Sequence, residues 1–78
     1  MTLSELKAGQ SAMIESINTS DPGIVRLMVL GLIEGVTVDF ENAAIGGDPL
    51  EVRVFGASIS IRKEHASQFK VRPVKRYV

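Results

Sequence analysis

Short segments in which apolar and polar residues alternate recur along the chain and predict β-strands. The clearest covers residues 36–42, where apolar side chains alternate with Thr37, Asp39 and Glu41 as in a half-buried strand. The same alternation, least regular in the first segment, recurs at residues 12–17, 50–54, 58–62 and 69–72. Turns rich in glycine, proline and polar residues separate these segments. We therefore predict a mostly β fold, a small closed barrel of about five short strands.

Residues 22–30 have the composition of a helix inserted between the first two strands. Ser20 or Asp21 can accept hydrogen bonds from free amides at the helix start, and Pro22 suits the first helical position. Gly31 can adopt the left-handed conformation that ends a helix. We therefore expect one helix near residues 22–30, closed at both ends by local signals.

One face of this helix is expected to be buried. Leu27 and Leu30 lie three residues apart and should face inward, with Ile24 at their flank. Just after the helix, Leu32 can fold back as an apolar contact, and Gly35 permits a tight turn into the next strand. The segment therefore predicts a helix-to-strand corner packed on the core.

The outward face of the same helix is unusually apolar. Val25 and Val29 project away from the inward pair, Met28 lies at the border, and Arg26 is the only charged residue. Apolar residues gathered on an exposed helix face often mark an interface, and methionine adapts to varied partners. Ordinary surface apolarity, or burial beneath the N-terminal segment, explains the pattern equally well. These residues, Val25, Arg26, Met28 and Val29, are the candidate partner surface.

The remaining segments predict short helical turns, loops and a tail. Residues 3–6 and 63–67 are each long enough for one helical turn, and Ala66 is the expected buried residue of the second. Pro73 is expected to end the last strand, so that residues 73–78 form a frayed tail. We predict a single domain over residues 1–78.

Composition limits the classes of function. The chain of 78 residues is 45% hydrophobic and can fill one small core. It contains no cysteine, which excludes disulfides, thiolate catalysis and thiolate metal sites. Its longest apolar run, residues 27–33, is far shorter than a membrane span, and the N-terminus does not resemble a signal peptide. We expect a soluble cytoplasmic protein with no membrane insertion.

The net charge of zero hides an asymmetry. From Arg62 onward the chain has six basic residues and one acidic residue, a net charge of +5, whereas the preceding part has three basic and eight acidic residues, a net charge of −5. A positive end could favour an anionic phospholipid or nucleic-acid partner. A solvated edge strand and tail is the simpler interpretation, because lysines on an edge discourage pairing with other chains.

No set of residues predicts catalysis or metal binding. His65 is the only histidine, and its neighbour Glu64 points about 100° away on a helical turn. The two side chains are therefore badly placed to coordinate the same metal ion. His65 is therefore expected to be exposed. Asp39 and Glu41 share the polar side of a strand, with no basic or nucleophilic partner evident. We predict no enzyme activity, no cofactor and no metal ligand.

Three further motifs have structural interpretations. The segment 46–48, Gly-Gly-Asp, is too short for a phosphate loop and lacks its lysine. Ser58 and Ser60 are expected to point outward, and no histidine is placed to complete a triad with them. Arg62, at the end of a strand, is expected to tie the rim of the barrel to a carbonyl or carboxylate, a structural role favoured over the alternative of contact with a partner.

Together these features resemble the FeoA family. The matching residues are Leu3-x-x-Leu6-x-x-Gly9, Arg26-Leu27-x-x-Leu30-Gly31-Leu32-x-x-Gly35-x-x-Val38, Gly47-Asp48-Pro49-Leu50, Ile59-x-Ile61-Arg62 and Ala66. Each is weak alone, but their order and spacing cover nearly the whole of residues 3–71. Glu34 stands where the family usually has proline, and the outward apolar residues of the helix stand where it commonly has polar ones.

The resemblance implies an SH3-like domain and a function. FeoA proteins are small cytoplasmic, non-enzymatic accessory partners of FeoB, the GTPase-bearing ferrous-iron transporter of bacteria, so it implies an adaptor that docks on FeoB or on a copy of itself. One alternative is a stand-alone relative of the SH3-like C-terminal domain of iron- and manganese-dependent repressors, without their helix-turn-helix. A nucleic-acid-binding barrel is disfavoured by the aromatic content of 5% and the neutral charge.

Overall fold

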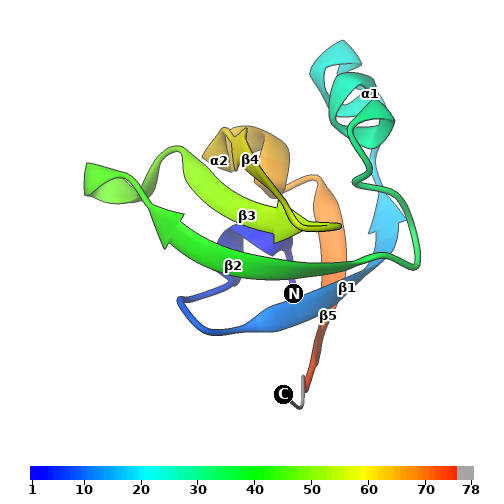
Figure 1. Cartoon of the computed structure of the whole chain (residues 1–78). Helices are drawn as coiled ribbons and strands as arrows, with labels where there is room; N and C mark the ends of the chain where they lie inside the picture. Colours follow the sequence, from blue (N-terminus) through cyan, green and yellow to red (C-terminus); the bar gives the residue numbers. More distant parts are fainter. Residues whose placement is uncertain (76–78) are drawn as a thin grey trace.

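The computed structural model describes residues 1–75 of the chain, and Figure 1 shows the arrangement of its elements. The elements are η1 (Leu3–Glu5), β1 (Ser11–Ile17), α1 (Pro22–Val29), β2 (Thr37–Ala43), η2 (Ile45–Gly47), β3 (Leu50–Val54), β4 (Ala57–Ile61), α2 (Lys63–Ala66) and β5 (Phe69–Val74), where η denotes a short 3-10 helix. The predicted mostly β fold with five strands, one inserted helix and short helical turns is confirmed.

The strands form one antiparallel sheet in the order β4-β3-β2-β1-β5. The register shifts in β1 between Ile14 and Ser16, and in β2 between Phe40 and Asn42. Irregularities of this kind bend a strand and increase its twist, so the sheet can fold around a core. The sheet is not closed, because β4 and β5 at its two ends do not pair with each other. The expectation of a closed barrel was therefore wrong.

The N-terminal segment explains why the sheet stays open. The Val71 N–H on β5 donates to the Met1 carbonyl at 2.8 Å, and Thr2 bridges to Lys70 of the same strand. This segment therefore occupies part of the edge that β4 would need in a closed barrel. The connection from β4 to β5 forms α2, which buries Ala66 and contacts η1.

The core contains only apolar side chains among the described residues, and Phe69 is its largest fully buried member. The buried set is Leu3, Leu6, Ala12, Ile14, Ile24, Leu27, Leu32, Val38, Leu50, Val52, Val54, Ile61, Ala66, Phe69 and Val71. Every strand contributes to it, as do α1, α2 and the N-terminal segment. Within residues 1–75, no helix has both the length and the apolar character needed to cross a membrane.

The corner after α1 has the geometry of a Schellman cap. The Gly31 N–H donates to the Met28 carbonyl at 3.0 Å, and the Leu32 N–H donates to the Leu27 carbonyl at 3.2 Å. Gly31 has a φ of +115°, which glycine adopts without strain. Leu32 is buried, as predicted, but Leu30 is 55% exposed. The inward placement of Leu30 was wrong: Leu30 is the C-cap of the helix, and Leu32, which folds back after Gly31, fills the inward position.

The last strand is longer than the sequence predicted. β5 continues through Pro73 and Val74, which pair with Ala12 and Ser11 of β1. The expectation that Pro73 ends the strand was wrong, because β5 is an edge strand and its outer side requires no N–H donor at that position. Of the predicted tail, residues 76–78 lie outside the described residues.

Candidate interaction surface

The candidate residues on α1 lie on its outer face. Val29 is 82% exposed, Val25 and Arg26 are also exposed, and Met28 is half-buried against the core. Burial of Ile24 on the opposite side fixes this orientation. Burial of the outer face beneath the N-terminal segment, one of the alternatives, does not occur. Figure 1 shows α1 at one end of the molecule, projecting beyond the strands.

The exposed apolar residues continue past the end of α1. Leu30 and Ile33 are exposed, and so is Phe55 in the β3–β4 turn, at 80%. The ring of Phe55 lies 3.4 Å from the position that a Cβ on Gly31 would occupy, so the turn adjoins the helix exit. Sequence reasoning missed Phe55 as a surface residue. Its signal was the two-residue turn Phe55-Gly56 between alternating strands, a position that points into solvent.

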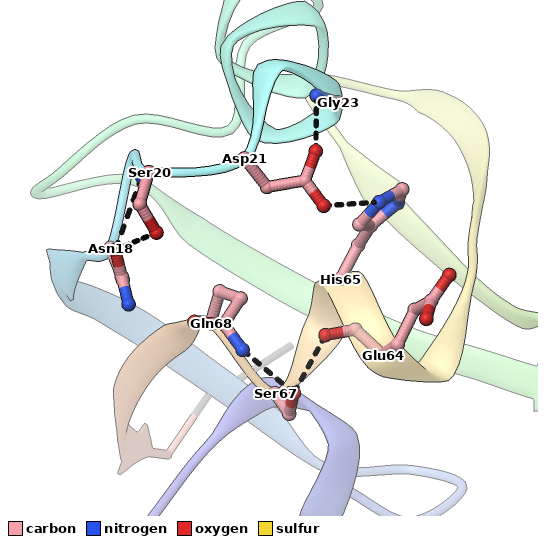
Figure 2. A network of polar contacts seen from close by, with 8 residues as sticks. All are labelled: Asn18, Ser20, Asp21, Gly23, Glu64, His65, Ser67 and Gln68. Atoms are coloured by element: carbon pink, nitrogen blue, oxygen red, sulfur yellow. Dashed lines mark hydrogen bonds and ion pairs between the residues drawn. The ribbon is translucent and has the colours of Figure 1, made fainter.

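The start of α1 is fixed by a polar network that joins it to α2 (Figure 2). Asp21 Oδ1 accepts a hydrogen bond from the Gly23 N–H at 2.8 Å, which makes Asp21 the N-cap of the helix. The other carboxylate oxygen, Oδ2, lies 3.3 Å from His65 Nε2 on α2. The same carboxylate therefore caps α1 and contacts α2, which links the start of the helix to the β4–β5 connection.

His65 is less exposed than the sequence predicted. Its side chain is 24% exposed, because it packs against Gly23 in the first turn of α1. A Cβ at Gly23 would lie 2.9 Å from both Cε1 and Nε2 of the imidazole, so any larger residue would require the ring to shift. The expectation of an exposed histidine was wrong, since pairing with Asp21 was not visible in the sequence.

Hydrogen bonds within the flanking segments complete the network in Figure 2. Asn18 Oδ1 accepts from the backbone N–H and the hydroxyl of Ser20, at 3.1 and 2.9 Å. Beside His65, the Ser67 hydroxyl donates to the Glu64 carbonyl at 2.6 Å. Among the described residues, no group of three or more His, Cys, Asp or Glu side chains lies close enough together to hold a metal ion.

The two carboxylates on β2 tie strands together. Glu41 accepts hydrogen bonds from the Ser58 hydroxyl at 2.6 Å and from Arg53 Nη2 at 2.8 Å. The bond from Ser58, followed by that from Arg53, lowers the pKa of Glu41 below its ordinary value. Asp39 accepts from the Ser11 hydroxyl at 2.6 Å. The expectation that these carboxylates have no basic partner was therefore wrong, because Arg53 on β3 reaches Glu41 on the neighbouring strand.

An open groove of about 540 Å³ lies beside the β3–β4 turn. Its lining residues are Gly35, Val36, Thr37, Asp39, Arg53, Phe55 and Gly56. Only two of these are ionisable, and Asp39 already accepts a hydrogen bond from Ser11. The groove adjoins the exposed ring of Phe55 and thus extends the apolar region at the end of α1.

Arg62 does not have the predicted role. Its carbonyl accepts from the His65 and Ala66 amides at 3.0 and 2.9 Å, so its backbone starts α2. Its side chain is exposed and has no hydrogen-bond or ion-pair partner within residues 1–75. The expected tie to the rim of the sheet was therefore wrong.

Comparisons with known proteins identify relatives in iron transport. The chain is 30% identical over 71 residues to a fusion of Fe(2+) transport protein A and the Fe(2+) transporter FeoB from Porphyromonas gingivalis, and the match covers 91% of this chain but 8% of that protein. The FeoA protein of Chlorobium tepidum is 36% identical, with a TM-score of 0.88 over 96% of this chain and 71% of that one. The zinc-complexed FeoA of Stenotrophomonas maltophilia, described as a prokaryotic SH3 domain protein, is 34% identical, with a TM-score of 0.81 over 92% of this chain and 89% of that one.

The fold is also shared with metal-dependent repressors. A manganese-dependent transcriptional repressor aligns with a TM-score of 0.83 at 15% identity, and 40% of its chain is covered. This likeness shows the SH3-like fold alone. The sequence model of the FeoA domain, in contrast, matches residues 1–73. The chain belongs to the FeoA family.

Proposed function

We propose that this chain is a non-enzymatic, cytoplasmic accessory protein of bacterial ferrous-iron uptake that acts by binding a FeoB-like GTPase transporter. The Porphyromonas gingivalis relative supports the pairing, because it carries FeoA and FeoB in one polypeptide. Fusion places two domains at a high effective concentration, which benefits domains that bind each other. A second copy of the chain is a further proposed partner.

The observation that carries the proposal is the exposed apolar face of α1. Val25 and Val29 lie in solvent on a helix that is held from behind by buried Ile24 and at its start by Asp21. An exposed apolar region on a helix in a fixed orientation is typical of a protein interface. The proposed partner surface is Val25, Arg26, Met28 and Val29.

The adaptor is proposed to act without holding the iron ion. Fe(II) favours clustered imidazole and carboxylate ligands, and His65, the only histidine in the chain, already faces Asp21 at 3.3 Å. Anaerobic calorimetric titration with Fe(II) is expected to give no stoichiometric heat of binding. A tight one-to-one site would contradict this part of the proposal.

Val29→Glu tests the partner surface. Because Val29 is 82% exposed, the change should leave folding intact, while a carboxylate in an apolar interface should weaken binding at least about tenfold. The measurement is calorimetric titration of each variant with the purified cytoplasmic part of a FeoB-like transporter.

Ile45→Glu is the matched control. Ile45 is fully exposed in η2, which lies at the opposite end of the molecule from α1 in Figure 1. The control should bind as the unchanged chain does. Equal binding by Val29→Glu and Ile45→Glu would refute the α1 surface, and no binding by the unchanged chain would refute the transporter as partner.

A further inference from the structure

The two edges of the sheet differ in their protection against pairing with other chains. The outer edge of β5 carries Lys70, Arg72 and Pro73, and part of it is covered by the Val71 N–H bond to the Met1 carbonyl. Lysine, proline and a covering segment are common means of blocking an edge strand. β5 is therefore a blocked edge.

β4 has none of these protections. Its sequence, Ala57–Ile61, contains no charged residue and no proline, and its pairing with β3 is unbroken from Val54–Ala57 to Leu50–Ile61. Within residues 1–75, no backbone group of β4 hydrogen-bonds to any element other than β3. β4 is therefore a regular strand with a free outer edge.

The geometry of the β3–β4 hairpin identifies the free backbone groups. The turn residues Phe55 and Gly56 have φ values of +51° and +79°, as in a type I′ two-residue turn. In such a hairpin the closing pair, here Val54 with Ala57, exchanges hydrogen bonds, and bonded and non-bonded pairs then alternate. The N–H and C=O groups of Ser58 and Ser60 therefore point away from β3.

We propose that this free edge is a dimerisation site, occupied by β4 of a second copy in antiparallel register centred on Ile59. This register pairs Ser58 with Ser60 of the second copy, and by symmetry Ser60 with Ser58, so all the outward backbone groups of both residues find partners. It is independent of the proposal for the transporter, which concerns α1.

The same register brings together two side chains that are exposed within one chain. It places Gly56 opposite Arg62 of the second copy, so Phe55 lies beside that arginine. Phe55 is 80% exposed, and the Arg62 side chain lacks a hydrogen-bond or ion-pair partner within residues 1–75. An arginine over an exposed aromatic ring forms a favourable cation–π contact.

A second copy fits this edge because self-pairing of β4 brings no like charges together. The facing residues are Ala57, Ile61, the two serines and Ile59 against itself, all uncharged. Self-pairing of β5 in the same antiparallel geometry, centred on Val71, would set Lys70 against Arg72 of the second copy, which is destabilising. The short strand makes a small interface, so we expect a transient dimer that forms at high protein concentration.

The test is amide hydrogen exchange by NMR over a concentration series, with sedimentation to report the oligomeric state. As the dimer forms, the Ser58 and Ser60 amides should exchange at least about tenfold more slowly, because a hydrogen-bonded amide exchanges only on opening. The exposed Thr19 amide should be unaffected. A chain that remains monomeric at millimolar concentration would overturn the proposal, as would a dimer whose Ser58 and Ser60 amides show no change.

Ser60→Pro removes one outward N–H without removing a bond to β3. We expect the dimer dissociation constant to rise roughly 30-fold, because two symmetry-related hydrogen bonds are lost. Ser60→Ala is the matched control: it keeps the N–H and should dimerise like the unchanged chain. Equal dimerisation by folded Ser60→Pro and Ser60→Ala would overturn the register. If the proline variant does not fold, the exchange experiment on the unchanged chain still tests whether β4 pairs with a second copy.

Discussion

Two sets of similar residues in and after α1 have opposite environments. The inner set, Ile24, Leu27 and Leu32, is buried in the core. The outer set, Val25, Val29, Leu30 and Ile33, is exposed although its side chains are equally apolar. Residue type alone therefore does not separate the two sets. Their environment is decided by helical spacing, by the position of the helix end and by the surface on which the helix packs.

The comparison separates stability from interaction. Burial of an apolar side chain in the core stabilises the folded chain. An exposed apolar side chain contributes such free energy only when a partner covers it. Substitutions in the inner set should therefore change the free energy of unfolding, and those in the outer set should change association.

The largest effect is expected for Ile24→Ala. Ile24 is completely buried, so its truncation should lower the free energy of unfolding by about 2–5 kcal/mol through lost burial and a residual cavity. Val25→Ala, one residue away in the outer set, should change it by less than about 0.5 kcal/mol. Urea denaturation of both variants measures the difference, and similar losses would remove the distinction between the sets.

A smaller loss of stability is expected for Gly31→Ala. Gly31 lies between Leu30 of the outer set and Leu32 of the inner set. The φ of +115° should cost alanine about 1–3 kcal/mol of backbone strain. The added Cβ would lie 3.4 Å from the Phe55 ring, an ordinary contact, so strain should dominate. Thermal unfolding should show a smaller loss for Gly31→Asn, which tolerates positive φ better. An unchanged Gly31→Ala variant would contradict the assigned cap.

The smallest effect is expected at the start of the helix, for Asp21→Ala. Loss of the N-cap bond to the Gly23 N–H should cost about 1 kcal/mol. Asp21→Ser retains a capping oxygen but not the carboxylate that faces His65, so it should recover most of the loss. Chemical denaturation measures the free energy of unfolding of the alanine and the serine variants. A serine variant as unstable as the alanine variant would show that the contact with His65 matters more than the cap.

The sequence predicted the features that depend on neighbouring residues. Alternation located all five strands, and the Pro22 and Gly31 signals located both ends of α1 to within about one residue. Leu32 was correctly predicted to fold back after the helix. These features are local, because strand period and helix caps depend on residues a few positions apart.

The errors concern contacts between residues far apart in the chain. His65 was predicted to be exposed because Asp21, 44 positions earlier, could not be recognised as its partner. Pairing of Glu41 with Arg53 and Ser58 was missed for the same reason. Leu30 is a local exception: it was placed inward from its three-residue spacing to Leu27, but at about 100° per residue it lies about 120° from the buried Ile24.

By itself, the sequence determined the elements of this protein, the corner after α1 and its resemblance to the FeoA family, since all of these are written in short-range spacing. Only the tertiary structure decided that the sheet stays open, that Asp21 at the start of α1 meets His65 of α2, and that Phe55 adjoins the helix exit. The physical reason is that edges and surfaces are defined by what packs beside them. A strand such as β4 is an edge only because the N-terminal segment, and not β4, pairs with β5.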